Sequence, residues 1–321
     1  LFSGAIRAQQ DASDMSNILE LTNCSQIDED KKYQYPPRVE SFTFDPDAYR
    51  LYSCFAQESI ARKPQDFRFK GFTNLSGSKS GVQVVNKLQG LPGSFVIDMI
   101  TDNERNVWMY IELVGLVRFD GFNFKVYTSE EGLVSDHIIK LEPKKQGRGI
   151  WIITEDGISD FDGLVFKNLF FEEDIISSFI TSSSVQGDTL LLGTRDQGLW
   201  SVSGEEIRVF EKNAGLASDM IESVYSSSDG KIWISHSDGT VEYIKDSSIR
   251  RLYLSSRTEK PVLLGEHQNG FYMYDRINKI IQNYVGGVIY ETELDIPETE
   301  KIAYKFSRDG IWFITRAEGM F

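Results

Sequence analysis

Residues 149–163 read GIWIITEDGISDFDG, and this stretch decides the fold class. An apolar run from Ile150 to Thr154 is followed by a short polar turn that ends at Gly157, and then by a segment in which apolar and polar residues alternate. A short apolar run is typical of a buried strand, and alternation is typical of a half-buried strand. The stretch therefore predicts two antiparallel strands joined by a tight turn.

The same pattern returns along the chain at a period of about 41 residues, which indicates stacked copies of one structural unit. The loop Gly132-Leu133-Val134-Ser135-Asp136 returns as Gly215-Leu216-Ala217-Ser218-Asp219, so loops repeat together with strands. Each copy has room for four short strands. The prediction is an all-β fold, a β-propeller of four-stranded blades. The repeated turn glycines are Gly115, Gly157, Gly198 and Gly239, and the repeated strand tryptophans are Trp108, Trp151 and Trp233.

The blade count depends on the end of the chain. Residues 263–271 copy residues 191–199, so Gly270 is expected to be the next turn glycine, in a shortened blade followed by one with an insertion around Val288 to Pro297. A ring closed within the chain would have about seven blades. Segment 67–72 or segment 41–44 would then complete the last blade. The alternative is that blades continue beyond Phe321.

Composition excludes several classes of partner. The net charge of −14 argues against binding to nucleic acid and to anionic membrane surfaces, because both require clusters of Lys and Arg. No apolar run is long enough for a membrane span, so no membrane insertion by this chain is expected. Residues 1–32 lack the repeat and are expected to be a mobile leader or the remnant of an export signal, with the propeller in residues 33–321. Whether Cys24 and Cys54 pair is left open, and neither a metal nor a cofactor is expected.

Residues 115–127 (GLVRFDGFNFKVY), the Gly132-Leu133 turn and the strand 150–154 resemble the two-component regulator propeller family. The resemblance extends over about residues 67–321. It implies a periplasmic or cell-surface sensor domain of a two-component signalling protein that binds an oligosaccharide or another small ligand, and for which a homodimer is expected. Similar propellers also occur in surface complexes linked to secretion or attachment. The alternative function is therefore an assembly module for protein–protein interaction.

In a propeller, the turns between second and third strands share one face with the loops between blades, and ligands usually bind there. Polar side chains in these turns, with an aromatic platform, are the groups that a sugar requires. For each single residue, turn geometry alone is the competing explanation. No nucleophile, zinc or phosphate motif is present, and the chain is not expected to be an enzyme. The alternative is a lyase, because some propellers that resemble this chain are lyases with a metal and a histidine base. The candidate ligand-binding residues are Glu112, Asp156, Arg195, Asp196, Trp200, His236, His267 and Arg316.

Overall fold

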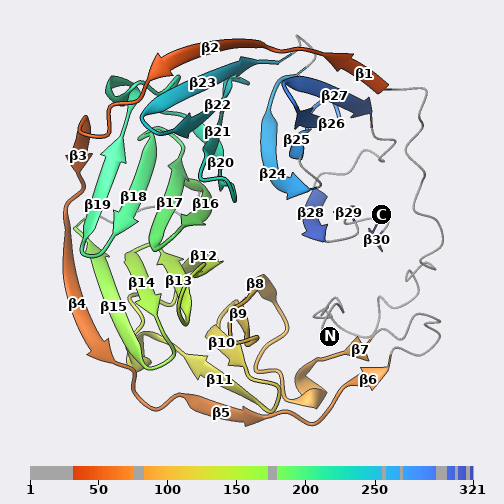
Figure 1. Ribbon diagram of the computed structural model, residues 1–321. Coiled ribbons are helices and arrows are strands. Elements are labelled where there is room, and N and C mark those ends of the chain that lie inside the picture. The colour runs from red at the N-terminus through yellow and green to blue at the C-terminus, as the bar shows by residue number, and fades with distance from the viewer. Residues whose placement is uncertain are drawn as a thin grey trace. The chain divides into compact units, whose positions relative to one another are not determined.

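The computed structural model (Figure 1) divides into two compact units. Unit 1 contains Leu1–Asn17, Ser53–Ser177 and Ser203–Glu206, and unit 2 contains Ile18–Tyr52, Ser178–Val202 and Ile207–Phe321. No helix within the described residues is long and apolar enough to span a membrane. The structure describes residues 32–74, 83–172, 179–254, 258–267, 270–293, 302–307, 310–315 and 319–320.

The described residues form five antiparallel sheets of five strands each, together with two smaller sheets. In every five-stranded sheet, four strands that follow one another in the chain are joined by a fifth strand from residues 32–68. The all-β prediction is confirmed. The prediction of four-stranded blades is not, because each of these sheets carries an additional outer strand.

Unit 1 contains two of the five-stranded sheets. The strands of the first are β8 (Val96–Thr101), β9 (Val107–Ile111), β10 (Gly115–Phe119), β11 (Asn123–Tyr127) and the outer β5 (Gln65–Arg68). Those of the second are β12 (Ile138–Pro143), β13 (Ile150–Thr154), β14 (Gly157–Phe161), β15 (Val165–Phe171) and the outer β4 (Cys54–Ile60). A small sheet consists of β6 (Thr73–Asn74) and β7 (Gln83–Val84).

Unit 2 contains the other three five-stranded sheets. The strands of the first are β16 (Ile180–Gln186), β17 (Thr189–Thr194), β18 (Leu199–Ser203), β19 (Glu206–Phe210) and the outer β3 (Tyr49–Leu51). Those of the second are β20 (Ile221–Ser226), β21 (Ile232–His236), β22 (Val241–Lys245), β23 (Ser248–Tyr253) and the outer β2 (Arg38–Thr43). Those of the third are β24 (Pro261–His267), β25 (Gly270–Asp275), β26 (Ile280–Val285), β27 (Val288–Glu293) and the outer β1 (Lys32–Tyr35). A three-stranded sheet consists of β28 (Ile302–Ser307), β29 (Gly310–Thr315) and β30 (Gly319–Met320).

We call residues 32–68 the belt, because their strands β1 to β5 form the outer edges of the five sheets in reverse order along the chain. In unit 2 the belt pairs Arg38 with Tyr253, and in unit 1 it pairs Cys54 with Phe171. Segment 67–72 or segment 41–44 was expected to complete an unfinished blade. Instead, β2 and β5 add a strand to sheets that already have four.

The apolar cores lie between neighbouring sheets of the same unit. In unit 1, Trp108 of β9 packs edge-on against Phe161 of β14, with ring centroids 5.7 Å apart. In unit 2, Trp233 of β21 stacks on Phe271 of β25, with centroids 4.1 Å apart. The repeated tryptophan position therefore serves packing between sheets, as such large apolar rings contribute most when buried.

The loops between consecutive sheets explain the repeated Gly-Leu-x-Ser-Asp motif. Each loop follows a short 3-10 helix, η4 (Ser129–Glu131) in unit 1 and η5 (Lys212–Ala214) in unit 2. The glycine after it, Gly132 or Gly215, has a positive φ of 119° or 103°, which favours glycine. The motif is thus a structural device that turns the chain from one sheet into the next.

The serine and aspartate of the motif complete this loop. In unit 1, Ser129 donates its backbone N–H to Asp136 Oδ1 over 2.6 Å, and His137 donates its backbone N–H to Ser135 Oγ over 3.3 Å. The same bonds recur in unit 2 with Asp219 and Ser218 as acceptors. Their side chains are therefore occupied by local backbone donors, as expected for these residue types in turns.

The predictions for the end of the repeat, at Gly270 and around Val288 to Pro297, are wrong. Gly270 lies between the first and second strands of its sheet, whereas the other repeated glycines lie between the second and third. Val288–Glu293 is the fourth strand of the same sheet, not an insertion in a later one. The count of about seven blades is not confirmed. The division into a leader at 1–32 and a propeller at 33–321 stays a prediction, because residues 1–31 lie outside the described residues.

Candidate functional site

The second-to-third strand turns of unit 1 lie beside the residues that precede its first strands. Glu112 donates its backbone N–H to the carbonyl of Phe95 over 2.9 Å, and Glu155 donates to the carbonyl of His137 over 3.1 Å. Two such corners, one from each sheet, form what we call the loop end of unit 1. Its members are Phe95, Ile97, Tyr110, Glu112, Leu113, Asp136, His137, Glu155 and Asp156.

Exposed apolar side chains gather at the first of these corners. Phe95 is 49% exposed, Ile97 is 58% exposed and Leu113 is 99% exposed. Ile97 lies at a register shift between Val96 and Asp98, and such bulges redirect a side chain out of the sheet. Leu113 has a φ of +63°, a conformation that non-glycine residues adopt rarely. The backbone thus presents apolar groups to solvent at this corner.

The charges of three carboxylates act on Tyr110, the half-buried tyrosine of β9. Burial raises the pKa of its phenol, and the charges of Glu112, Glu155 and Asp136 raise it further. These carboxylates come from both sheets of unit 1, so the loop end combines a phenol with several acceptors of hydrogen bonds. The arrangement suits a ligand with apolar faces and many hydroxyl donors.

Four of the predicted residues lie in second-to-third strand turns. Glu112 and Asp156 belong to the loop end of unit 1, where Glu112 is exposed and Asp156 is half-buried. Arg195 and Asp196 are exposed in the β17–β18 turn of unit 2, and Arg195 donates its backbone N–H to Phe179 over 2.9 Å. Binding by these residues stays a prediction.

Trp200 and His236 do not face a ligand, because both are fully buried. Trp200 packs against Tyr52 and Phe179, with ring centroids 4.3 and 5.4 Å away. Trp200 follows the turn glycine Gly198, whereas the repeated tryptophans lie in the second strand. This aromatic core explains its different position, so Trp200 is not a platform for a sugar. His236 lies within a polar network inside the second sheet of unit 2, described below.

His267 also falls outside the predicted face. His267 ends β24 and precedes the turn between first and second strands, which lies at the end of the sheet opposite to the second-to-third turn. Arg316 lies outside the described residues. Because His236 is fully buried, its prediction as a ligand-binding residue is wrong, whereas the predictions for Arg195 and Arg316 stay untested.

The predicted site residues did not include Glu242, whose fully buried side chain lies at the centre of a polar network. His236 Nε2 lies 2.9 Å from Glu242 Oε1, and Arg251 Nε donates to Glu242 Oε2 over 2.9 Å. Burial by itself raises the pKa of the Glu242 carboxyl. The hydrogen bond and charge of His236, the backbone N–H of Ala217 and the charge of Arg251 outweigh it, so the pKa lies below its ordinary value of 4.5.

This network holds the loop that leads into its sheet. Ala217 donates its backbone N–H to Glu242 Oε1 over 3.0 Å, and Arg251 Nη2 donates to the carbonyl of Gly215 over 3.2 Å. Within the described residues, His236 Nδ1 has no hydrogen-bond partner. The network is closed off from solvent, so its role is structural. Its signal in the sequence is the replacement of neutral side chains of the repeat by Glu242 and Arg251.

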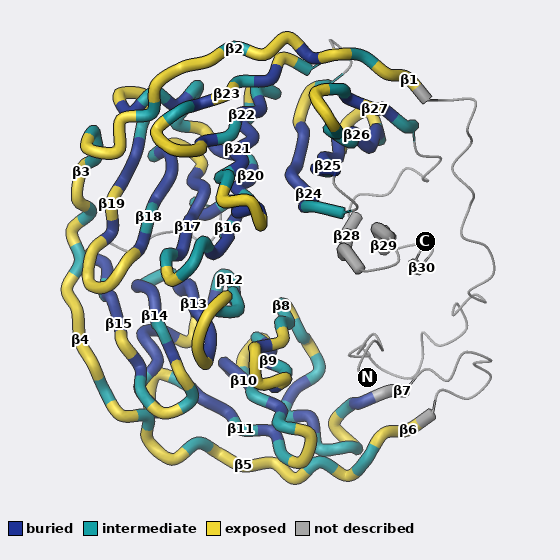
Figure 2. Tube along the Cα trace, viewed as in Figure 1, coloured by how far each residue is buried: buried dark blue, intermediate teal, exposed yellow. Residues whose placement is uncertain are grey.

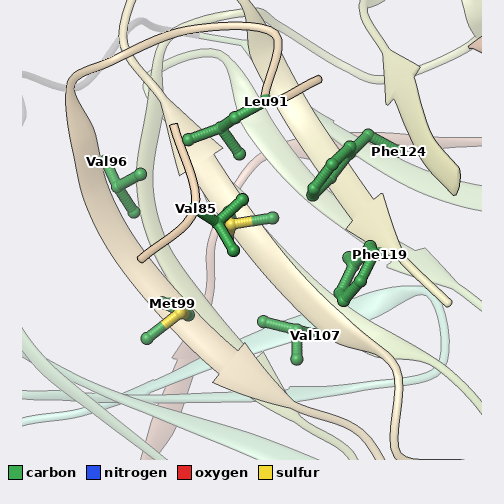
Figure 3. A pocket seen from close by; sticks show the side chains of 8 residues that line it. Val85, Leu91, Val96, Met99, Val107, Phe119 and Phe124 are labelled. Atoms are coloured by element: carbon green, nitrogen blue, oxygen red, sulfur yellow. The ribbon is translucent and has the colours of Figure 1, made fainter. Parts of the chain in front are cut away.

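Neither a metal site nor a polar lining of the cavity in unit 1 is found among the described residues. Among the described residues, no three His, Cys, Asp or Glu side chains lie close enough together to hold a metal ion. A cavity of about 20 Å³ in unit 1 has room for about one water molecule and is lined by apolar side chains (Figure 3). It is a packing defect of the core. Its lining residues are Val85, Leu91, Val96, Met99, Val107, Met109, Phe119 and Phe124.

No family model matches the sequence, and no curated protein matches it at a significant level. Solved structures do share its fold. Virginiamycin B lyase from Staphylococcus aureus, as a catalytically inactive variant with quinupristin, is 15% identical with a TM-score of 0.57, over 84% of this chain and 98% of the lyase. Because lyases share the fold, the expectation that the chain is not an enzyme is overturned.

Extracellular domains of putative hybrid two-component systems from B. thetaiotaomicron are similar as well. The domain of BT3049 is 19% identical with a TM-score of 0.53, over 74% of this chain and 34% of that domain. The domain of BT4673 is 17% identical with a TM-score of 0.51, over 79% of this chain and 32% of that domain. This chain thus spans about a third of their length. The resemblance to two-component sensor propellers is confirmed at the level of the fold: the chain has an all-β fold of the propeller type.

Proposed function

We propose that the chain is an extracytoplasmic ligand-binding sensor propeller of a two-component signalling protein, exported to the periplasm or cell surface, and that it binds an oligosaccharide at the loop end of unit 1. The observation that carries the proposal is the corner where Phe95, whose side chain is 49% exposed, is joined to the turn by the backbone hydrogen bond from Glu112. Its fold, shared with extracellular domains of hybrid two-component systems, supports the setting.

The chemistry of the corner limits the ligand class. An exposed aromatic ring offers a platform for the C–H face of a sugar, and carboxylates accept hydrogen bonds from its hydroxyl groups. The carboxylates of Glu112, Asp136 and Glu155 act together on Tyr110, so they also repel negative charge. The expected ligand is therefore a neutral oligosaccharide, and sulfated or uronic acid oligosaccharides are disfavoured.

A thermal-shift screen tests the proposal, because a ligand that binds only the folded state raises the melting temperature. We expect neutral oligosaccharides of one class to raise it and anionic oligosaccharides to leave it unchanged. Phe95→Ala and Glu112→Gln should abolish the shift. The matched control is Phe122→Ala, since Phe122 is 77% exposed in the β10–β11 turn at the opposite end of the same sheet.

The outcomes separate this proposal from the assembly module, the second candidate. Exposed Phe95, Ile97 and Leu113 also suit apolar side chains of a peptide, and YCF48 bound to a peptide has the same fold with a TM-score of 0.51 at 11% identity, over 89% of this chain and 94% of that one. A peptide that stabilises the wild type but not Leu113→Ser, together with no effect of any sugar, would favour assembly. A sugar-induced shift that survives Phe95→Ala would place the site elsewhere.

A further inference from the structure

The belt leaves each five-stranded sheet with an exposed outer edge. An edge strand presents backbone N–H and C=O groups to solvent, and it pairs readily with a strand from another chain unless it is protected. Figure 2 shows that β2, β4 and β5 are largely exposed along their length. The question is which of these edges lacks protection.

Protection of an edge comes from short length and from charged side chains. The strand β3 has three residues, β5 has four with Asp66 and Arg68, and β2 has six with Arg38 and Glu40. In contrast, β4 has seven residues and a single charge, Glu58. That charge lies opposite Lys167 of β15 within its own sheet. Among these belt strands, β4 is therefore the longest and the least protected.

The exposed side chains of β4 are suited to pairing. Phe55 is 54% exposed and stacks on Phe170 of β15, with ring centroids 4.9 Å apart, so its ring is held at the edge. Ile60 is 81% exposed at the other end of the strand. Large apolar groups on an exposed edge strand lose contact with water when a second strand covers them.

The sequence of β4, CFAQESI, is complementary to itself when two copies run antiparallel. With a two-fold axis through Gln57, Phe55 of one copy faces Ser59 of the other, and Ala56 faces Glu58. No like charges face one another, and opposed like charges are what destabilises such pairs. Self-complementarity of this kind is what a two-fold interface requires.

The charges near β4 also favour a second copy over other parts of the surface. From Tyr49 to Gln65 the charged residues are Arg50, Glu58, Arg62 and Lys63, in a chain whose net charge is −14. Two acidic molecules repel each other least where the local charge is not negative. The edge of β4 is such a place.

We propose that β4 is an interface between two copies of this chain, which pair antiparallel across a two-fold axis at Gln57 and join their sheets into one. The interface does not depend on where a ligand binds. Because edge pairing buries less surface than a standard interface, the dimer is weak and its population depends on concentration.

Sedimentation velocity over a hundredfold range of concentration tests the proposal. The wild type should shift from monomer to dimer. Gln57→Glu and Gln57→Lys each place like charges opposite themselves, so each should raise the dissociation constant about tenfold or more. An equimolar mixture of the two variants should dimerise again. The control is Val39→Glu on β2, a residue 40% exposed, which should behave as the wild type.

Three results would overturn the proposal. These are a wild type that stays monomeric at every concentration, a dimer that both Gln57 variants retain, and a mixture that fails to dimerise although each variant is folded. A wild type that stays monomeric but binds a strand from another protein would replace the second copy by that partner. Circular dichroism and melting temperature establish that each variant is folded.

Discussion

The second sheet of unit 1 and the second sheet of unit 2 both hold the loop that leads into them by side-chain hydrogen bonds to its backbone. The side chains are neutral in unit 1 and charged in unit 2. In unit 1, Ser159 Oγ accepts the backbone N–H of Val134 over 3.3 Å, and Asn168 Nδ2 donates to the carbonyl of Gly132 over 2.8 Å. In unit 2, Glu242 and Arg251 make the corresponding bonds to Ala217 and Gly215.

The difference shows that one position of the repeat accepts either a neutral polar side chain or a charged one. Ser159 and Glu242 occupy the same place in the repeat, and each faces the residue of the fourth strand that holds the loop. The neutral pair Ser159 and Asn168 carries no charge that burial would destabilise, so its hydrogen bonds to the loop are sufficient. A buried carboxylate needs several partners, and Glu242 obtains them from His236, Arg251 and Ala217. The charged network of unit 2 is therefore stable only when Glu242 and all of its partners are present.

The largest effect is expected when the charged network is broken. Glu242→Ala leaves Arg251 and His236 without their carboxylate, and the free energy of unfolding should fall by about 3–5 kcal/mol. Ser159→Ala, the matched change in unit 1, removes one neutral acceptor and should cost about 1 kcal/mol. Urea denaturation measures both. Equal losses in the two variants would contradict the distinction between the sheets.

A smaller difference is expected at the loop glycines. A Cβ at Gly132 would meet Phe166 and Ser59 side-chain atoms at 3.1 Å, and these side chains can shift. A Cβ at Gly215 would lie 2.3 Å from the backbone oxygen of Thr43 in the belt. With the positive φ at both, Gly132→Ala should cost about 1–2 kcal/mol. Gly215→Ala should cost about 2–3 kcal/mol in the same assay.

The smallest effect concerns pH. Because the pKa of Glu242 is lower in the folded protein than its ordinary value of 4.5, its ionised form stabilises the fold above that pH. This contribution should be lost as pH falls from 4.5 through the folded-state pKa. Unfolding free energies measured from neutral pH into the acid range should decline less steeply for Glu242→Gln than for Ser159→Ala. Parallel curves for the two variants would show that Glu242 does not titrate as argued.

The repeated strands and turns could be predicted from the sequence, but the last unit of the repeat and the outer strands of the sheets could not. Gly115 and Gly157 were placed correctly because an apolar strand, a turn glycine and an alternating strand recur together. Gly270 was misplaced since residues 263–271 imitate that string, and a buried apolar run does not reveal which strand of a sheet it forms. The belt was missed as a whole, because strands with neither face buried, such as β4, carry no alternation for a pattern to detect.

The candidate site was only half predictable for a related reason. Turn position selected Glu112 and Asp156, whose role in binding stays a prediction, but it also selected His236, which is buried beside Glu242, six residues later, and Arg251 of another strand. Leu113 and Ile97 reach solvent through a left-handed residue and a bulge. Residue type does not reveal either backbone feature. The prediction considered polar residues in turns, so it did not include these exposed apolar side chains.

The belt has a consequence for how the protein is made. It leaves the ribosome before any of its partners, and the order is inverted, since β5 finds β11 soon after synthesis whereas β1 waits for β27. The hydroxyl of Tyr35 donates to Glu291, which lies 256 residues later in the chain. Contacts so distant in sequence form late and slow the search for the native state. The first described strand to be translated is therefore among the last to find its place, and its backbone N–H and C=O groups lack their partner strand until β27 has been made.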